Sequence, residues 1–303
     1  LMFKQRKKID KFYILLPVYN DWPSLKKLLL IIDKKLIFLK GVVTVVVVND
    51  ASTTKPNLDT KKFKKIKQIQ IINLKKNLGS QKSISIGLKH LKNKNESIVL
   101  VIDSDGEDDV GQVKKMFLTA MKFENYIVVS NRTKRREVFY FKIFYKIHLL
   151  ITLLLTWKWI SFGNFTSFHT KHIKKLNFND AWLAFPAVLI KSFKLKNLYA
   201  ERKNRYFGRS KVSFLKLFFH SFSIISVFYK KIFFNSVLYC VFFYFICKFL
   251  ENNYFIFLFS GLIFLNIALL TYRLFFKIKN KPTGKKFIKN IMIINNKRTI
   301  KNN

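Results

Sequence analysis

Five of the sixteen acidic residues in this chain lie between positions 103 and 109, although the chain carries 57 lysines and arginines. Asp103 and Asp105 come directly after an apolar run, and Gly106 allows the backbone to turn, so that both carboxylates can reach one ion. Hard oxygen ligands suit Mg²⁺ or Mn²⁺, especially where substrate phosphates supply the remaining ligands. The spacing therefore indicates a site for a metal and a diphosphate. The alternative is an acidic loop that caps the next helix.

The segments around this cluster alternate between apolar runs and helical patterns. Continuous apolar or β-branched runs predict buried parallel strands at 12–19 and 42–50, and segments 66–74 and 97–103 predict two more strands. Between the first two runs, leucine and isoleucine recur at helical spacing from Leu25 to Leu36, and residues 80–91 predict a second helix. This alternation predicts an α/β domain with a mainly parallel sheet.

Polar clusters follow three of these runs. They are Tyr19, Asn20 and Asp21 after the first run, Asn49, Asp50 and Ser52 after the second, and Asp103, Ser104 and Asp105 after the fourth. Ligands of such sheets bind outside the carboxyl ends of the strands. The three clusters are therefore expected to converge along one edge.

The C-terminal third of the chain has a different character. Segments 232–250 and 254–272 are apolar and 19 residues long, close to the roughly 20 that cross a bilayer as a helix, and three residues separate them. They predict a transmembrane hairpin. Lysines lie at both outer ends, whereas the connecting loop contains Glu251 and neither Lys nor Arg. The positive-inside rule therefore places both outer ends on the cytoplasmic side.

These patterns divide the chain into four segments. Residues 1–212 form the α/β domain, 213–231 an interfacial amphipathic helix, 232–275 the hairpin and 276–303 a basic cytoplasmic tail. The interfacial segment is aromatic but too polar to span, with a core helix as the alternative. The apolar stretch 148–157 is too short to cross a membrane and predicts a core or membrane-contacting helix.

The formal net charge of +41 indicates nucleic acid, an anionic membrane or a phosphorylated substrate as partner, although a bias toward lysine explains most individual lysines. The aromatic residues concentrate in the membrane-like segments and no nucleic-acid motif is recognised, which argues against nucleic acid. Cys240 and Cys247 are too few for a Cys-based zinc site, and seven residues apart on a helix they are too distant for a disulfide.

Seven motifs follow one another along the chain, namely LLPVYND, VVVVNDAST, NLKKNLGSQKSISIGL, VLVIDSDGEDD, SNRTKRRE, FGNFTSFHTKHIKKL and RKNRYFGRSKVSF. Together they resemble the family 2 glycosyltransferases with a GT-A fold. The branch they resemble most contains dolichyl-phosphate mannose synthases and bacterial polyprenyl-phosphate glycosyltransferases. The resemblance covers about residues 12–215 and implies a Rossmann-like GT-A domain; the apolar hairpin also fits the bacterial members.

The resemblance implies roles for the residues at the sheet edge. The nucleotide pocket would be lined by Pro17, Tyr19, Asp21 and Asp50. Asp103 and Asp105 match the Asp-x-Asp that holds the metal and the diphosphate of the donor. Glu107 stands where this branch usually has Gln, as a third metal residue, and Asp108 matches the aspartate that follows it.

The resemblance also implies cationic partners for phosphate on the membrane side. Arg205, Gly208, Ser210 and Lys211 match an Arg-x-x-Gly-x-Ser-Lys motif, in which Arg205 and Lys211 are the expected catalytic cations. Arginine can bind phosphate bidentately and lysine adds a point charge. The alternative is a basic juxtamembrane stretch attracted to anionic lipid.

Three positions depart from the family pattern. Asn49 and Ala51 stand where Asp and Gly are common, and Asn164 stands where this branch usually has Asp, which removes a carboxylate from the acceptor side. Asp180 is a candidate catalytic base, with a helix N-cap as the alternative.

These features predict a membrane-anchored, inverting glycosyltransferase of cell-envelope glycan biosynthesis. It would move a sugar from a UDP or GDP sugar to polyprenyl phosphate with the help of Mg²⁺ or Mn²⁺. A phosphate acceptor is anionic near neutral pH and needs no general base. The rivals are transfer to a hydroxyl of a glycan or glycolipid, with Asp180 as base, and a non-catalytic basic protein that binds membranes. The sequence is also compatible with a homo-oligomer.

Overall fold

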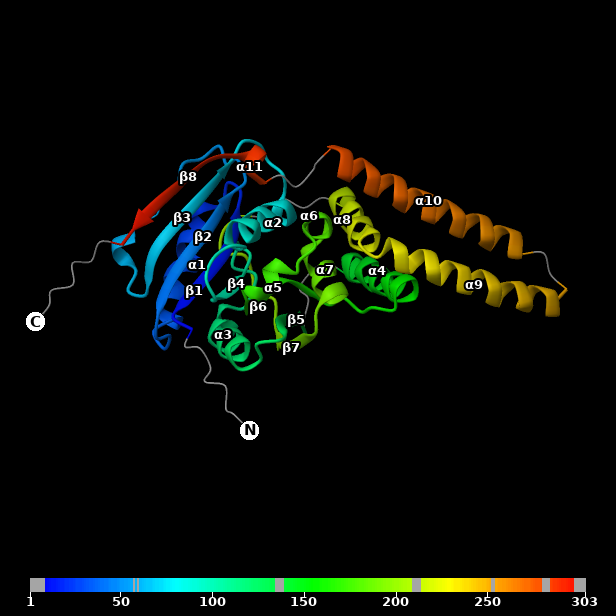
Figure 1. The fold of residues 1–303 in the computed structure, drawn as a ribbon, viewed down its shortest axis with the longest axis horizontal. Coiled ribbons are helices and arrows are strands. Elements are labelled where there is room, and N and C mark those ends of the chain that lie inside the picture. Colours follow the sequence, from blue (N-terminus) through cyan, green and yellow to red (C-terminus); the bar gives the residue numbers. More distant parts are fainter. Residues whose placement is uncertain are drawn as a thin grey trace, which may run out of the picture.

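The computed structural model describes residues 9–56, 58, 60–133, 139–208, 214–251, 254–279 and 284–296. Within these residues, a central eight-stranded sheet is packed between helices. Two long helices, α9 (Tyr229–Phe249) and α10 (Phe255–Lys279), extend side by side away from the sheet (Figure 1).

Buried apolar runs form the middle of the sheet. β1 (Lys11–Val18) and β2 (Val42–Asn49) are buried after their first residues, and β4 (Ile98–Val101) is buried throughout. Successive side chains point to opposite faces. Ile14 and Leu16 thus belong to one hydrophobic cluster, whereas Leu15 belongs to the other. Apolar residues on both faces are what a sheet covered on both sides requires.

The strand order is β7-β5-β6-β4-β1-β2-β3-β8. The strands not yet described are β3 (Ile66–Leu74), β5 (Ile127–Arg132), β6 (Phe162–His169), β7 (Leu195–Ala200) and β8 (Ile288–Asn295). Neighbours run parallel from β4 through β1 and β2 to β3, and so do β5 and β7. β6 is antiparallel to β4 and β5, and β8 is antiparallel to β3. The predicted α/β fold is confirmed, with a sheet that is parallel at its centre and mixed toward both margins.

Helices cover both faces of this sheet. α1 (Trp22–Lys35) and α3 (Val113–Lys122) pack into one hydrophobic cluster, and α2 (Ser80–Leu91), α6 (Phe178–Leu183) and α7 (Phe185–Ser192) pack into the other. A Cβ at Gly87 would overlap the Leu15 side chain, so glycine allows α2 to lie close to β1. The short helices are η1 (Thr60–Lys62), η2 (Val110–Gln112), α5 (Lys171–Lys174) and α11 (Gly284–Phe287).

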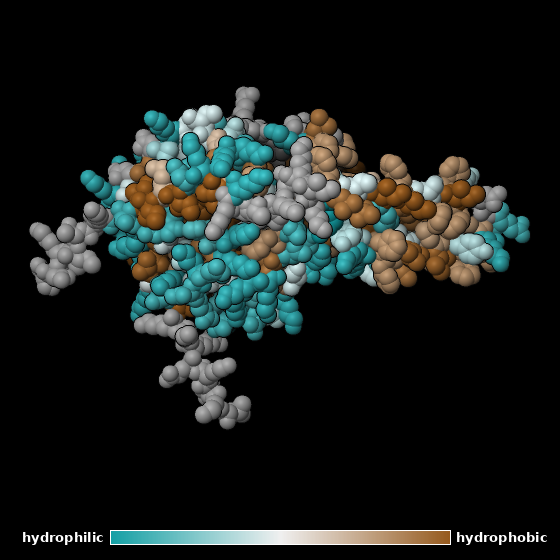
Figure 2. All heavy atoms as spheres, turned by 45° about the horizontal axis from the view of Figure 1, so that its top comes forward, coloured by the Kyte–Doolittle hydropathy of each residue, from teal (hydrophilic) through white to brown (hydrophobic). Residues whose placement is uncertain are grey.

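The predicted apolar hairpin is formed by α9 and α10. By length and composition, Tyr229–Phe249 and Phe255–Phe275 can each cross a membrane, and few of their residues are buried within the protein. Figure 2 shows apolar side chains gathered along the projecting part of the molecule. The two helices are therefore candidate membrane spans. Cys240 and Cys247 lie on α9 as free thiols.

Two shorter apolar helices, α4 (Phe139–Thr156) and α8 (Phe214–Ser226), lie at the base of the hairpin. The side chains of Asn235 and Tyr239 on α9 donate hydrogen bonds to the carbonyl oxygens of Leu155 (2.8 Å) and Leu154 (2.5 Å) at the end of α4. Stretch 148–157 is thus mostly part of α4. Both helices leave large apolar side chains exposed, among them Phe144, Leu150, Phe218 and Phe219.

The prediction of a separate basic tail at 276–303 is wrong for the residues described there. α10 continues to Lys279, and β8 then joins the sheet beside β3. The amide Nδ2 of Asn73 donates to Asn290 Oδ1 at 2.7 Å across this pair. The isoleucine-rich strand β8 supplies the backbone partners that one side of β3 would otherwise lack. The sheet domain therefore includes residues from both sides of the hairpin.

Candidate active site

The loops that follow β1 and β2 meet at the carboxyl edge of the sheet. Asn20 and Ala51 both have a positive φ, 48° and 57°, and so turn the backbone sharply. The N–H of Asn20 donates to Ser52 Oγ at 2.9 Å, and the N–H of Thr53 donates to Asn20 Oδ1 at 2.8 Å. The predicted convergence of these two polar clusters is confirmed.

Asp50 shapes the turn that leads into α2. Its carboxylate accepts hydrogen bonds from the N–H groups of Leu78 at 2.7 Å and Gly79 at 2.8 Å. Gly79 has a φ of 88°, a conformation that favours glycine. Burial raises the pKa of Asp50, and the two N–H donors act in the opposite direction. Asp50 therefore fixes the backbone at this edge, and its contact with a nucleotide remains a prediction.

The other residues predicted to line the nucleotide pocket lie at the end of β1. Pro17 is opposite Val48 of β2, and Tyr19 is 40% exposed just beyond the strand. Asp21 immediately precedes α1, and its carboxylate lies 2.6 Å from the guanidinium of Arg205. These three residues thus share the edge with Asp50, in positions that suit a ligand lying across the strand ends.

The carboxylates of the acidic loop after β4 have different partners. Asp103 accepts hydrogen bonds from the amide of Asn164 at 2.9 and 3.2 Å, and Asp105 accepts one from the N–H of Glu107 at 3.0 Å. Asp108 lies 3.7 Å from the guanidinium of Arg132. Asp109 is the N-cap of η2, and its side chain accepts a hydrogen bond from the N–H of Gly111 at 3.1 Å. The capping interpretation thus holds for Asp109 alone within this loop.

Three carboxyl groups of this loop have raised pKa values. Burial, with the charges of Asp108 and Asp105 next in order, raises the pKa of Asp103 to about 7. Burial, followed by the charge of Glu107, raises the pKa of Asp105 to about 6. Burial also raises the pKa of Asp108. Carboxylates crowded in this way attract a cation, because a positive charge relieves both their mutual repulsion and their desolvation.

A basic segment after β7 lies against the acidic loop. The N–H groups of Lys203 and Tyr206 donate to the carbonyl oxygens of Glu107 (2.8 Å) and Asp105 (3.0 Å). The Tyr206 ring lies over Gly106, where any Cβ would collide with it; Gly106 also has a φ of 82°. The conformation and the close approach both require glycine here.

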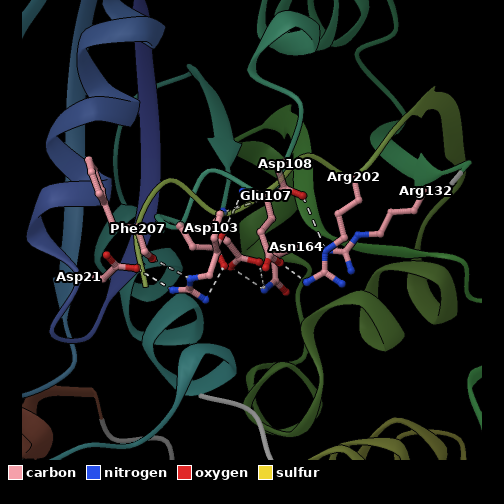
Figure 3. Close-up of polar contacts among 10 residues, drawn as sticks. Asp21, Asp103, Glu107, Asp108, Arg132, Asn164, Arg202 and Phe207 are labelled. Carbon is pink, nitrogen blue, oxygen red and sulfur yellow. Dashed lines mark hydrogen bonds and ion pairs between the residues drawn. The ribbon is translucent and has the colours of Figure 1, made fainter. Parts of the chain in front are cut away.

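Two arginines of this segment form ion pairs with the acidic residues (Figure 3). Arg202 pairs with Glu107. Arg205 lies 2.6 Å from Asp21 and 3.3 Å from Asp105, and therefore joins the loop after β1 to the loop after β4. The three polar clusters and the basic segment thus form one site.

The position of Arg205 corrects one expectation. Arg205 was expected at the end of the site opposite the nucleotide residues, whereas its guanidinium contacts Asp21, which is one of them. The cause is local charge balance, because a partly buried carboxylate requires a cation nearby. The role of Arg205 toward an acceptor phosphate stays a prediction. Of the rest of the motif, Gly208 has a φ of 69°, and Ser210 and Lys211 lie outside the described residues.

The donor set fits a divalent cation that takes two of its ligands from the protein. Within the described residues, no group of three or more His, Cys, Asp or Glu side chains is arranged to hold a metal. Glu107, predicted as the third metal residue, is instead paired with Arg202. Asp103 and Asp105 remain, with the hard oxygen ligands that Mg²⁺ or Mn²⁺ prefers when substrate phosphates complete the coordination.

Asp180 is neither the N-cap of α6 nor a free base. Asn177 caps this helix by accepting from the N–H of Asp180 at 3.3 Å. The buried Asp180 carboxylate lies 2.8 Å from Lys191 Nζ on α7 and 2.5 Å from Arg273 Nη2 on α10. The N-cap expectation is therefore wrong. The role as a base stays a prediction, and the two cations paired with the carboxylate, one from the hairpin and one from α7, argue against it.

Sequence reasoning missed Arg132, Arg202 and Gln81. The two arginines lie in motifs that the sequence had already singled out, and the need of buried carboxylates for cations would have identified them. Gln81 donates to Asn164 Oδ1 at 3.0 Å. A polar residue in the first turn of a helix carries no signal for such a role.

The family model for glycosyl transferase family 2 matches residues 13–195, which include most of β1, the acidic loop and Asn164. The chain belongs to glycosyl transferase family 2. The Rossmann-like GT-A fold that the resemblance implied is confirmed. No curated protein is significantly similar in sequence.

The chain is similar to solved structures of glycosyltransferases. Glucosyl-3-phosphoglycerate synthase from Mycobacterium tuberculosis, in complex with Mn²⁺, UDP-glucose and phosphoglyceric acid, has a TM-score of 0.51 and 13% identity, over 74% of this chain and 80% of that chain. S. aureus TarS 1–349 in complex with UDP-GlcNAc has a TM-score of 0.45 and 18% identity, over 72% of this chain. The present chain spans 66% of that TarS chain.

Proposed function

We propose that this enzyme is a membrane-anchored, inverting glycosyltransferase that transfers a sugar from a nucleotide diphosphate sugar to a lipid-linked phosphate, most simply polyprenyl phosphate. The observation that carries the proposal is the attachment of the apolar hairpin to the catalytic domain through the buried Asp180 carboxylate and Arg273 of α10. A catalytic domain held in this way against two candidate spans is suited to an acceptor that lies in a bilayer.

The return of the chain to the sheet supports a hairpin that crosses the membrane twice. β8 follows α10 and is hydrogen-bonded to β3, so the chain before α9 and the chain after α10 must lie on the same side of a membrane. An even number of crossings satisfies this requirement. The lysines at the outer ends of the hairpin then favour the cytoplasmic side for the catalytic domain.

The donor end of the site would be built by the loops after β1, β2 and β4. Asp103 and Asp105 would hold Mg²⁺ or Mn²⁺, which as a Lewis acid would neutralise the departing diphosphate. The hydrogen bond from the N–H of Gly79 to the Asp50 carboxylate would hold the backbone of this turn in place beside the nucleotide. The M. tuberculosis synthase was crystallised with Mn²⁺ and UDP-glucose, which supports a donor and a metal of these classes.

A phosphate acceptor suits the site better than a hydroxyl acceptor. A hydroxyl needs a base, and the candidate base Asp180 is buried and bound by two cations. A phosphate oxygen is already anionic and can attack directly, with Arg205 and Lys211 as its expected cationic partners. Transfer to a hydroxyl of a glycan or glycolipid is the second candidate.

Transfer of label to lipid tests the proposal. Membranes containing the enzyme would be incubated with radiolabelled UDP, GDP and dTDP sugars, and lipid would be extracted; Asp103→Asn membranes are the control. We expect one sugar to enter a lipid that releases it in mild acid, as a sugar phosphate ester does. Label in an alkali-stable, phosphate-free glycolipid would instead show a hydroxyl acceptor, and no label above the control would contradict the proposal.

A further inference from the structure

Asn164 belongs to a chain of amide hydrogen bonds behind the acidic loop, and Figure 3 shows the end of this chain at Asp103. Its Nδ2 donates to both oxygens of Asp103, at 2.9 and 3.2 Å. Its Oδ1 accepts from Gln81 Nε2 at 3.0 Å, and Gln81 Oε1 accepts from the N–H of Phe185 at 2.7 Å. β6, α2 and the start of α7 are thus joined to the metal-site carboxylate.

The direction of this chain is fixed from the helix end. A backbone N–H can only donate, so Phe185 requires the oxygen of Gln81. The amide nitrogen of Gln81 then faces Asn164 and requires its oxygen, which leaves the Asn164 nitrogen facing Asp103. Each donor therefore points toward Asp103, and neither amide can be turned round without breaking a bond.

The origin of the chain adds to its effect on Asp103. Phe185 is the first residue of α7, and its N–H has no partner within that helix. The N-terminal end of a helix carries partial positive charge, which favours negative charge nearby. Phe185 is fully buried, so Gln81 also satisfies an N–H that water cannot reach.

We propose that Asn164 and Gln81 are positioning residues that orient the Asp103 carboxylate for the divalent cation, an inference that rests on the metal role in the proposed function. An aspartate at position 164 cannot donate to Asp103 when ionised, and it would add a charge to carboxylates that already repel one another. Asparagine here is thus a functional replacement, in which a donor that holds Asp103 takes the place of the carboxylate usual in this branch.

Binding of Mn²⁺ alone to the full-length protein in detergent, followed by electron paramagnetic resonance, tests the inference without turnover. Gln81→Met keeps the length of the side chain and removes both hydrogen bonds, yet Gln81 does not contact Asp103 in the bonds described. We expect its Mn²⁺ affinity to fall about 10- to 100-fold, the usual cost of losing a partner behind a metal ligand. The Mn²⁺ affinity of Asn164→Leu should fall by the same factor.

The matched control is Asn131→Leu on the adjacent strand β5. Asn131 and Asn164 are both 7% exposed, but Asn131 Oδ1 accepts from Ser161 Oγ at 2.7 Å, outside the chain. Its Mn²⁺ affinity should equal that of wild type even where its thermal stability falls. In the double variant of Gln81→Met and Asn164→Leu, the second change should add little, because the first already interrupts the chain.

The outcomes separate the two proposals. If wild type binds Mn²⁺ and Asp103→Asn binds it equally well, the metal site itself is wrong, and the positioning role is wrong with it. If Asp103→Asn loses Mn²⁺ but Gln81→Met and Asn164→Leu keep wild-type affinity, the positioning role alone is overturned. Equal losses in Gln81→Met and the Asn131→Leu control would show a general effect of stability, which also overturns it.

Discussion

Replacement of Asp180 by alanine should loosen the attachment of the hairpin rather than remove a catalytic base. The carboxylate is 1% exposed and lies between Lys191 and Arg273, at 2.8 and 2.5 Å. The same two cations also donate to the carbonyl oxygens of Val227 (2.7 Å) and Ser226 (3.3 Å), just before α9. The alanine variant leaves two positive charges at a junction of four helices without their shared anion.

The size of the effect follows from the exposure of the two cations. Loss of one partner from a buried ion pair costs about 3–5 kcal/mol. Lys191 is 36% exposed, so water solvates its ammonium group and it contributes little to this cost. Arg273 is only 19% exposed and contributes most of it. We therefore expect the lower limit, about 3 kcal/mol. At about 2–4 °C for each kcal/mol in a protein of this size, the unfolding temperature should fall by about 6–12 °C.

Thermal unfolding in detergent, together with transfer rates well below the transition, measures both quantities. Asp180→Ala should keep transfer within about tenfold of wild type. The combined variant Asp180→Ala and Arg273→Met should be less destabilised than the sum of the two single variants, because the arginine no longer lies unpaired. An unchanged unfolding temperature with a loss of transfer of about 100-fold or more, the usual contribution of a general base, would refute the attachment role of Asp180 and favour a hydroxyl acceptor.

Four further predictions concern the site and its topology. Asp103→Asn should abolish metal-dependent transfer in a folded protein, and full activity of wild type in excess EDTA would contradict the metal role. The pKa values of Asp103 and Asp105 are raised to about 7 and about 6, so the folded metal-free protein binds protons more tightly than the unfolded chain. The unfolding temperature of the metal-free protein should therefore fall as the pH rises from about 4 to 7. The fall should be smaller in Asp103→Asn. Arg205→Ala should reduce transfer by about one to two orders of magnitude, at roughly 1.5 to 3 kcal/mol for each charged hydrogen bond, and should alter donor affinity too, because Arg205 contacts Asp21. A cysteine at position 289, in a background without native cysteines, should resist membrane-impermeant reagents added outside intact cells.

Local sequence patterns predicted the elements that carry the site. Strand β3 and helix α2 occupy the predicted residues 66–74 and 80–91, and the isoleucines of the strand and the apolar residues of the helix are buried. The polar clusters after β1 and β2 could also be predicted to meet, since parallel strands end at one edge.

The partners of charged side chains could not be predicted in the same way. Asp180 and Arg273 are 93 residues apart, and Arg205 and Asp21 are 184 apart. No periodicity links such pairs; they form because packing removes water from a carboxylate, which then pairs with a cation that the fold brings near. Strand β8 was not predicted for a related reason. Its isoleucines follow a lysine-rich stretch, which indicated a tail, and only the fold shows that the open edge of β3 can pair with them.

Helix α7 connects the base of the candidate membrane hairpin to the acidic loop. Its first N–H, at Phe185, starts the amide chain that ends at Asp103, and its Lys191 bonds both Asp180 and the carbonyl of Val227 near the base of the hairpin. α7 is only eight residues long and most of it is buried, so it cannot shift at one end without shifting at the other. The distance between the acidic carboxylates and the candidate membrane spans is therefore set by a packed helix. For an acceptor whose phosphate stays near the bilayer surface, that fixed distance would determine whether the phosphate reaches the donor sugar.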